Sequence, residues 1–202
     1  MNEGMNRSLA TIVLVALAAS GCRRDPGRDV KPMAATPAQT LANASETIAL
    51  ENVSKSQAAV IGQRIANTEI TITYSRPVAR GRTLFGGIVA YDTVWNPGAD
   101  QATAIATTRD ISVNGHPLAA GKYSIWVIPR AGAWTTIFSK AADVYHTPYP
   151  GEAQDALRFD VQPTSGPHTE TLTFDFPKVE GKDAELQLRW GTVVVPLSIV
   201  VP

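Results

Sequence analysis

The most suggestive chemistry in this 202-residue sequence lies between positions 70 and 91, which contain three arginines and no acidic residue. The arginines are Arg76, Arg80 and Arg82. A guanidinium matches a carboxylate or a phosphate through two parallel hydrogen bonds, so this residue type is suited to anion recognition. Glycines in the same segment allow backbone amides to approach a ligand closely. The segment therefore predicts either an anion or sugar pocket or a loop that the arginines brace.

Aromatic and acidic residues follow directly, in YDTVWNPGADQAT, which begins at Tyr91. Tyr91 and Trp95 are suited to form a stacking wall in a pocket. The same stretch also fits a tight corner, because aspartate and asparagine beside proline and glycine are common turn formers. In that alternative the arginines pair with Asp92, Asp100 or Asp110 and pin a long loop across the domain. The candidate ligand-binding residues, all on the loop 76–101, are Arg76, Arg80, Arg82, Tyr91, Trp95 and Asp100.

Familiar catalytic signatures are missing from the sequence. It contains no Gly-x-Ser-x-Gly, His-Glu-x-x-His or Cys-x-x-Cys motif and no phosphate-binding glycine loop. A hydrolase is the alternative function, with Asp92, Asp100 or His146 as acid or base. His168 and Glu170 would share one strand face, but two ligands make only half of a metal site. We therefore predict no catalytic residue, no metal and no cofactor.

The N-terminus carries the most specific signal in the chain. MNRSLATIVLVALAASGC has a short polar start, an apolar run and small residues before Cys22. The run is shorter than the about 20 apolar residues that span a bilayer, so residues 1–21 fit a secretory signal peptide. The end of this stretch, ASGC, resembles a bacterial lipobox, whose cysteine becomes lipidated. Because Cys22 is the only cysteine, we expect lipidation there, with the membrane as a partner through this anchor. The predicted location is the bacterial cell envelope, facing the periplasm or the cell surface.

Composition narrows the remaining possibilities. Lysine plus arginine and aspartate plus glutamate each number 18, so the net charge is zero, which argues against nucleic acid as a partner. After the cysteine, residues up to 56 are rich in small and polar types and cannot bury enough surface to repay their ordering entropy. Residues 22–56 are therefore expected to form the lipidated cysteine and a flexible linker.

From about residue 57 onward, apolar and polar residues alternate with a period of two, which is typical of β-strands. EITITYS alternates Ile70, Ile72 and Tyr74 against threonine and serine. The dipeptide Asn114-Gly115 separates two strand-like pieces and is a strong hairpin signal. The last two strands are predicted in AELQLRW and TVVVPLSIVV.

These patterns predict about nine or ten strands and no long amphipathic helix. The expected fold is all-β: one antiparallel β-sandwich or flattened barrel over residues 57–202. Three tryptophans fall in alternating strand patterns and are expected in the core, without a functional role; they are Trp126, Trp134 and Trp190.

A family resemblance adds to this interpretation. ITITYSRPVARGRTLFGGIVAYDTVWNPGADQAT, followed by LAAGKYSIWVIP and WTTIFSK, resembles the bacterial secreted family known as domain of unknown function 2911. The resemblance covers about residues 57–201 and implies a β-rich envelope protein; it assigns no catalytic residue. The family usually has arginine and glutamate where this sequence has Asn96 and Gln101, and asparagine where it has Asp100. This chain therefore lacks both partners of any function that rests on that arginine and glutamate.

The sequence as a whole predicts a lipid-anchored envelope protein with a β-sandwich domain. The function that we predict is that of a non-enzymatic module. It would bind a small anionic or glycan ligand, or a protein partner, on the loop 76–101.

Overall fold

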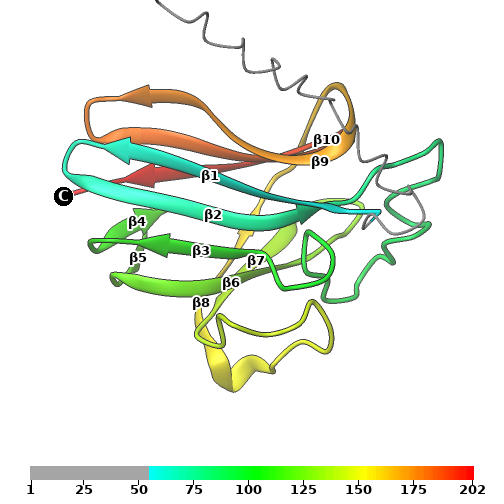
Figure 1. Ribbon diagram of the computed structural model, residues 1–202, viewed down its shortest axis with the longest axis horizontal. Helices are drawn as coiled ribbons and strands as arrows, with labels where there is room; N and C mark the ends of the chain where they lie inside the picture. Colours follow the sequence, from blue (N-terminus) through cyan, green and yellow to red (C-terminus); the bar gives the residue numbers. More distant parts are fainter. Residues whose placement is uncertain (1–54) are drawn as a thin grey trace, which may run out of the picture. The chain divides into compact units, whose positions relative to one another are not determined.

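The computed structural model describes residues 55–202 (Figure 1). The predicted signal peptide, Cys22 and all but the last two residues of the predicted linker lie outside these described residues. Within residues 55–202, no helix is long and apolar enough to cross a membrane. The helical content of this part is one 3-10 turn (η2, Glu152–Gln154).

Ten antiparallel strands form two sheets. The larger sheet has the order β1-β2-β3-β6-β7-β8, and the smaller has the order β5-β4-β10-β9. The all-β, sandwich-like prediction is therefore confirmed. The strands are β1 (Gln57–Ile65), β2 (Thr68–Arg76), β3 (Ala104–Thr107), β4 (Ile111–Val113), β5 (His116–Leu118), β6 (Gly121–Ile128), β7 (Trp134–Ser139), β8 (Asp155–Val161), β9 (Thr164–Glu180) and β10 (Asp183–Val200).

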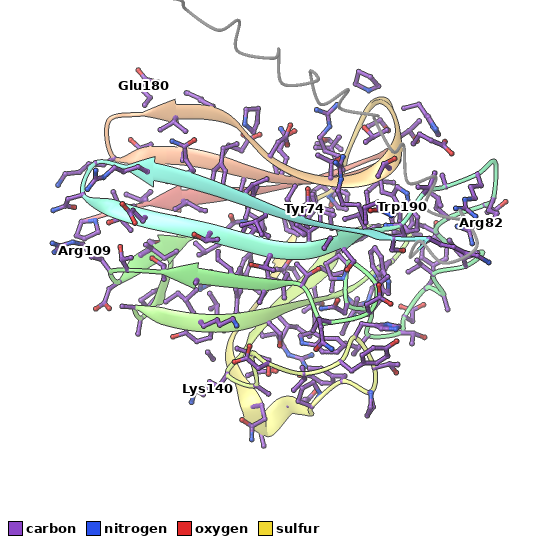
Figure 2. All side chains as sticks on the ribbon, viewed as in Figure 1. Tyr74, Arg82, Arg109, Lys140, Glu180 and Trp190 are labelled. Atoms are coloured by element: carbon purple, nitrogen blue, oxygen red, sulfur yellow. The ribbon has the colours of Figure 1, made fainter. Side chains whose placement is uncertain are left out.

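The predicted alternation places apolar side chains in one core between the sheets. Ile70 and Ile72 of β2 are fully buried and Tyr74 is nearly so, whereas the threonines between them are only partly buried or exposed. From β9, Phe174 meets the ring of Tyr74 edge-on at 5.0 Å between centroids. Figure 2 shows Tyr74 and Trp190 among the strands, as expected for core residues. Burial of such side chains supplies the main stabilisation of the domain.

The Asn114-Gly115 hairpin forms as predicted. Both residues have positive φ, 49° and 81°, which is the combination that a two-residue type I′ turn requires. The turn joins β4 to β5 and also contacts β10, because the side-chain oxygen of Asn114 accepts a hydrogen bond from the Ser198 amide at 2.7 Å. The dipeptide therefore links the edge hairpin to the interior strand of the smaller sheet.

The two predicted C-terminal strands are in fact one strand, β10, and the prediction of separate strands is wrong. The pairing of β10 with β9 is irregular around Gly191, which has a φ of 58°. A β-bulge of this kind bends a strand without ending it. A Cβ on Gly191 would lie 2.8 Å from Cδ1 of Leu84, so the bend also allows the loop after β2 to pack closely on β10.

A second, smaller apolar cluster lies around Trp126, and the segment between β7 and β8 packs on it through Val144 and Tyr149. The Tyr149 hydroxyl donates to the carboxylate of Asp155 and accepts from Nη2 of Arg158 at 3.2 Å. Burial, and then the bond to Asp155, raise the pKa of Tyr149 to about 12. The hydroxyl therefore stays protonated at neutral pH and fastens this segment to β8.

Candidate functional site

The loop that carries most candidate residues crosses one end of the domain, between the end of β2 and the start of β3 (Figure 1). Its first part runs beside β9: the Ala79 amide donates to the Glu170 carbonyl at 2.8 Å, and the Leu172 amide donates to the Pro77 carbonyl at 2.9 Å. Its later part meets β6, where Trp95 and Val127 exchange two backbone bonds of 2.8 Å. Both sheets therefore hold the loop in place.

The Asn-Pro-Gly stretch is a structural corner, as the turn interpretation predicted. Asn96 is 1% exposed; its side chain donates to the Ile125 carbonyl at 2.7 Å and accepts from the Thr103 amide at 3.0 Å. The Thr103 hydroxyl closes the corner by donating to the Pro97 carbonyl at 2.7 Å. A Cβ at Gly98 would lie 2.6 Å from that hydroxyl oxygen, so only glycine fits there without a shift. This corner fixes where Trp95 enters the site.

The three arginines take three different positions. Arg76 faces β9 and donates to the Leu172 carbonyl at 3.3 Å and to the Thr173 hydroxyl at 3.0 Å. Within residues 55–202, none of the ion pairs involves Arg76, Arg80 or Arg82. The alternative in which they pair with nearby aspartates is therefore wrong. Backbone carbonyl groups accept from the side chains of Arg76 and Arg82, and the Thr173 hydroxyl also accepts from Arg76.

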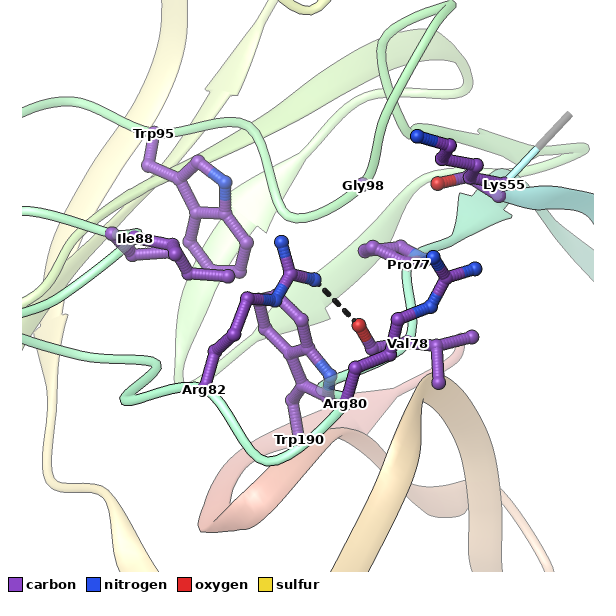
Figure 3. Close-up of a pocket in the computed structure, with 11 residues that line it drawn as sticks. Lys55, Pro77, Val78, Arg80, Arg82, Ile88, Trp95, Gly98 and Trp190 are labelled. Atoms are coloured by element: carbon purple, nitrogen blue, oxygen red, sulfur yellow. Dashed lines mark hydrogen bonds between the residues drawn. The ribbon is translucent and has the colours of Figure 1, made fainter.

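Arg80 and Arg82 line a pocket of about 310 Å³ together with Lys55 (Figure 3). The other lining residues among positions 55–202 carry no charge, so this part of the chain surrounds the space with three cations and no acid. Trp95 and Trp190 form an aromatic wall, with stacked rings 5.9 Å apart between centroids. The pocket therefore combines positive charge with flat apolar surface. Its remaining lining residues are Ser56, Pro77, Val78, Ile88, Val89 and Gly98.

Arg82 is held in position by the loop itself. Its Nε donates to the Ala79 carbonyl at 2.9 Å and its Nη2 donates to the Val78 carbonyl at 2.6 Å, the second of which is drawn in Figure 3. Within the described part of the chain, no hydrogen bond engages Nη1. The guanidinium is therefore fixed on one edge and presents donors on the other. Such preorganisation lowers the entropic cost of binding an anion.

Arg80 sits in a backbone conformation that non-glycine residues rarely adopt, with a φ of 52°. Its amide donates to the carboxylate of Glu170 at 2.6 Å, and the other Glu170 oxygen lies 3.0 Å from Nε2 of His168. The bond with His168, and then the bond from the Arg80 amide, hold the pKa of Glu170 below its usual value. An ionised Glu170 therefore holds a strained turn that directs the Arg80 side chain toward the pocket.

The pocket assembles only half of the predicted ligand-binding residues. Arg80, Arg82 and Trp95 lie together, while Arg76 points toward β9. Tyr91, 44% exposed, lines an adjoining hollow of about 410 Å³ that also contains Arg82. Asp100 lines a separate hollow of about 500 Å³. The loop therefore contributes to three hollows rather than to one site.

Three lining residues of the pocket lie outside the predicted loop 76–101: Lys55, Ser56 and Trp190. Lys55 was assigned to the linker, and no spacing connects it to the arginines. Trp190 was assigned to the core, correctly, since it is 2% exposed; its ring nevertheless closes one side of the pocket because the bulge at Gly191 brings β10 under the loop. The alternation of β10 would identify Trp190 as buried but not as part of a site.

Of the residues considered for hydrolysis, Asp92 is engaged by an arginine, whereas Asp100 and His146 are neighbours through their backbones. Asp92 forms an ion pair with Arg130 at 3.3 Å. The His146 amide donates to the Asp100 carbonyl at 3.0 Å, which joins the two backbones. In the described region no group of three potential ligands accompanies His168 and Glu170, so the pair lacks the third ligand that a metal site needs.

The comparison with protein families gives one match. Residues 56–199 match the model of the family described as a protein of unknown function, DUF2911. The chain belongs to this family. Comparisons with curated proteins and with solved structures gave no significant match. In this DUF2911 protein the resemblance seen in the sequence is therefore confirmed. Two of the three residues that differ from the usual family pattern, Asn96 and Gln101, face different surroundings. Asn96 is buried in the corner, whereas Gln101 is exposed and pairs by backbone with Tyr145.

Proposed function

We propose that this protein is a non-enzymatic binding module that holds a small anionic ligand in the pocket of Lys55, Arg80 and Arg82. The observation that carries this proposal is the lining that residues 55–202 provide: three cations, no acid, and an aromatic wall around about 310 Å³. Ligand pockets are concave and largely apolar, with a few well-placed polar groups. Among the described residues, lysine and arginine side chains are the only titratable groups in the lining, so these residues offer no carboxylate or histidine for acid–base catalysis.

An Arg80→Gly variant tests this function with little cost to the fold. Glycine adopts positive φ without the penalty of about 1–2 kcal/mol for other residues, and this offsets the about 0.5–1 kcal/mol that its flexibility costs. The amide bond to Glu170 is kept. We expect the melting temperature to stay within about 3 °C of wild type, while affinity for an anion falls about tenfold through the loss of one charge-assisted bond.

The measurement is titration of the purified protein with inorganic phosphate, citrate and galacturonate, followed by tryptophan fluorescence and thermal shift. At 100 times its dissociation constant a ligand stabilises by about 2.7 kcal/mol, or roughly 5–10 °C for a domain of this size. Binding should weaken as salt rises, because the pocket is open to solvent. If no anion shifts the wild-type melting temperature, or if Arg80→Gly binds as tightly as wild type, the proposal is wrong.

The second part of the proposal is that the domain is attached to the bacterial envelope through a lipid on Cys22. The lipobox-like ASGC at residues 19–22 supports it, together with the absence of any other cysteine in the chain. Two or more acyl chains would give stable anchoring, where one would not. In a bacterial host, we expect radiolabelled palmitate to be incorporated into the full chain and the protein to sediment with membranes. A Cys22→Ala variant that still incorporates label and sediments with membranes would contradict this.

A further inference from the structure

Two neighbouring hollows share a wall at Arg82. Arg82 and Trp190 line both the cationic pocket and the hollow that contains Tyr91, Phe85 and His168. The second hollow, of about 410 Å³, again receives no acidic residue from the described part of the chain. Positive or protonatable groups therefore stand on both sides of Arg82.

Glu170 lines neither hollow but contacts residues of both. One of its carboxylate oxygens accepts from the Arg80 amide, at the rim of the first hollow, and the other contacts the His168 ring, in the lining of the second. Its backbone carbonyl also accepts from Nε1 of Trp190 at 3.3 Å, the ring common to both. The geometry of the first hollow is thus coupled through one residue to that of the second.

Exposed apolar side chains accompany charge on both sides. Ile88, 47% exposed, lines the first hollow and Tyr91, 44% exposed, lines the second. The Tyr91 ring packs closely against Gly86, since a Cβ on this glycine would lie 2.8 Å from Cε2 of Tyr91. Exposed and immobilised aromatic rings are suited to stack against the face of a ligand.

We propose that the two hollows form one binding groove for an acidic oligosaccharide, with sugar rings on both sides of Arg82. This inference rests on the proposed anion-binding function and names its ligand class. Each hollow offers a cationic group and an apolar surface. Each ring of an acidic sugar chain offers the matching groups, a carboxylate and a flat C–H face. Inorganic phosphate or a single acid would fill the first hollow alone and leave Tyr91 without a contact.

The test compares trigalacturonate, galacturonate, neutral maltotriose and inorganic phosphate by calorimetric titration of the purified protein. We expect trigalacturonate to bind at least about tenfold more tightly than galacturonate, since a linked second contact is gained without a second loss of translational freedom. Maltotriose should bind at least about tenfold more weakly than trigalacturonate, because it offers no carboxylate to the cations.

Tyr91→Ala separates the two hollows. Truncation of an interface aromatic commonly costs more than about 1 kcal/mol, or about fivefold. We expect trigalacturonate affinity to fall about fivefold or more, galacturonate affinity to change less than twofold, and Tyr91→Phe to behave as wild type. Tyr145→Ala is the matched control, because this tyrosine is 50% exposed and lines neither hollow.

The outcomes distinguish this inference from the function on which it rests. If galacturonate or phosphate binds as tightly as trigalacturonate, or if Tyr91→Ala leaves trigalacturonate affinity unchanged, the inference of a single groove is wrong. The proposed anion-binding function would still hold. If maltotriose matches trigalacturonate, the ligand is a neutral sugar and the acidic class is wrong. If none of the three anions binds, the proposed function and this inference fail together.

Discussion

Replacing Arg82 with alanine is expected to reduce anion affinity about 10- to 100-fold and to destabilise the loop as well. The side chain makes two hydrogen bonds to loop carbonyls and presents its other edge to the pocket. A bond from a charged donor contributes about 1.5–3 kcal/mol, which sets the loss of affinity. The lost carbonyl bonds are largely exposed to water, so we expect the free energy of unfolding to fall by only about 0.5–1.5 kcal/mol.

The measurement pairs chemical denaturation with anion titration on the same variants. Arg82→Lys keeps the charge but has no fork to span two carbonyls, so its affinity should lie between those of wild type and Arg82→Ala. Arg109→Ala is the matched control: Arg109 lies away from Arg82 in Figure 2 and its Nε donates to the Asn67 carbonyl. An Arg82→Ala protein that binds anions as wild type does would refute the role given to this residue.

Asn96→Ala is expected to lower the free energy of unfolding by about 2–4 kcal/mol, the largest stability effect predicted for the loop. Alanine leaves the Thr103 amide and the Ile125 carbonyl without the Asn96 side chain in a buried corner. Each buried group left unpaired costs about 1–3 kcal/mol. The melting temperature should fall by roughly 5–15 °C.

Urea denaturation followed by tryptophan fluorescence measures this loss directly. Asn67→Ala provides the control, because Asn67 is exposed, and exposed substitutions usually stay within about 0.5 kcal/mol of wild type. Because the corner positions Trp95, anion affinity should also fall in Asn96→Ala. Equal stability of the two variants would mean that water or neighbouring groups satisfy the corner without Asn96.

Much of the fold could be predicted because the signals were local. The alternation in β2 reports which side of a strand is buried, and the Asn114-Gly115 turn has few conformations open to it. The continuity of β10 could not be predicted, since a glycine between two strand patterns marks a loop or a bulge equally well. The packing of Leu84 against Gly191 decides between a loop and a bulge, and these two residues lie more than 100 positions apart in the chain.

The candidate site was predicted only in part, because some of its residues are distant from one another in the sequence. Arg80, Arg82 and Trp95 come from one loop, and their closeness in sequence was a usable guide. Arg76 is equally close in sequence, yet it is the last residue of β2, where alternation turns its side chain toward β9. Lys55 and Trp190 enter from elements at opposite ends of the domain sequence, and no spacing rule relates them to the loop.

Trp190 belongs at once to the central core and to the pocket. One wall of the pocket is therefore inherited from the scaffold and resists change, because truncating a buried tryptophan costs about 3–5 kcal/mol. Arg80 and Ile88 of the pocket and Tyr91 of the adjoining hollow are exposed on the loop. These residues can be exchanged at little cost to folding. A new ligand preference in such a protein would evolve, or be engineered, by substitution of the exposed loop residues while the buried tryptophan stays unchanged.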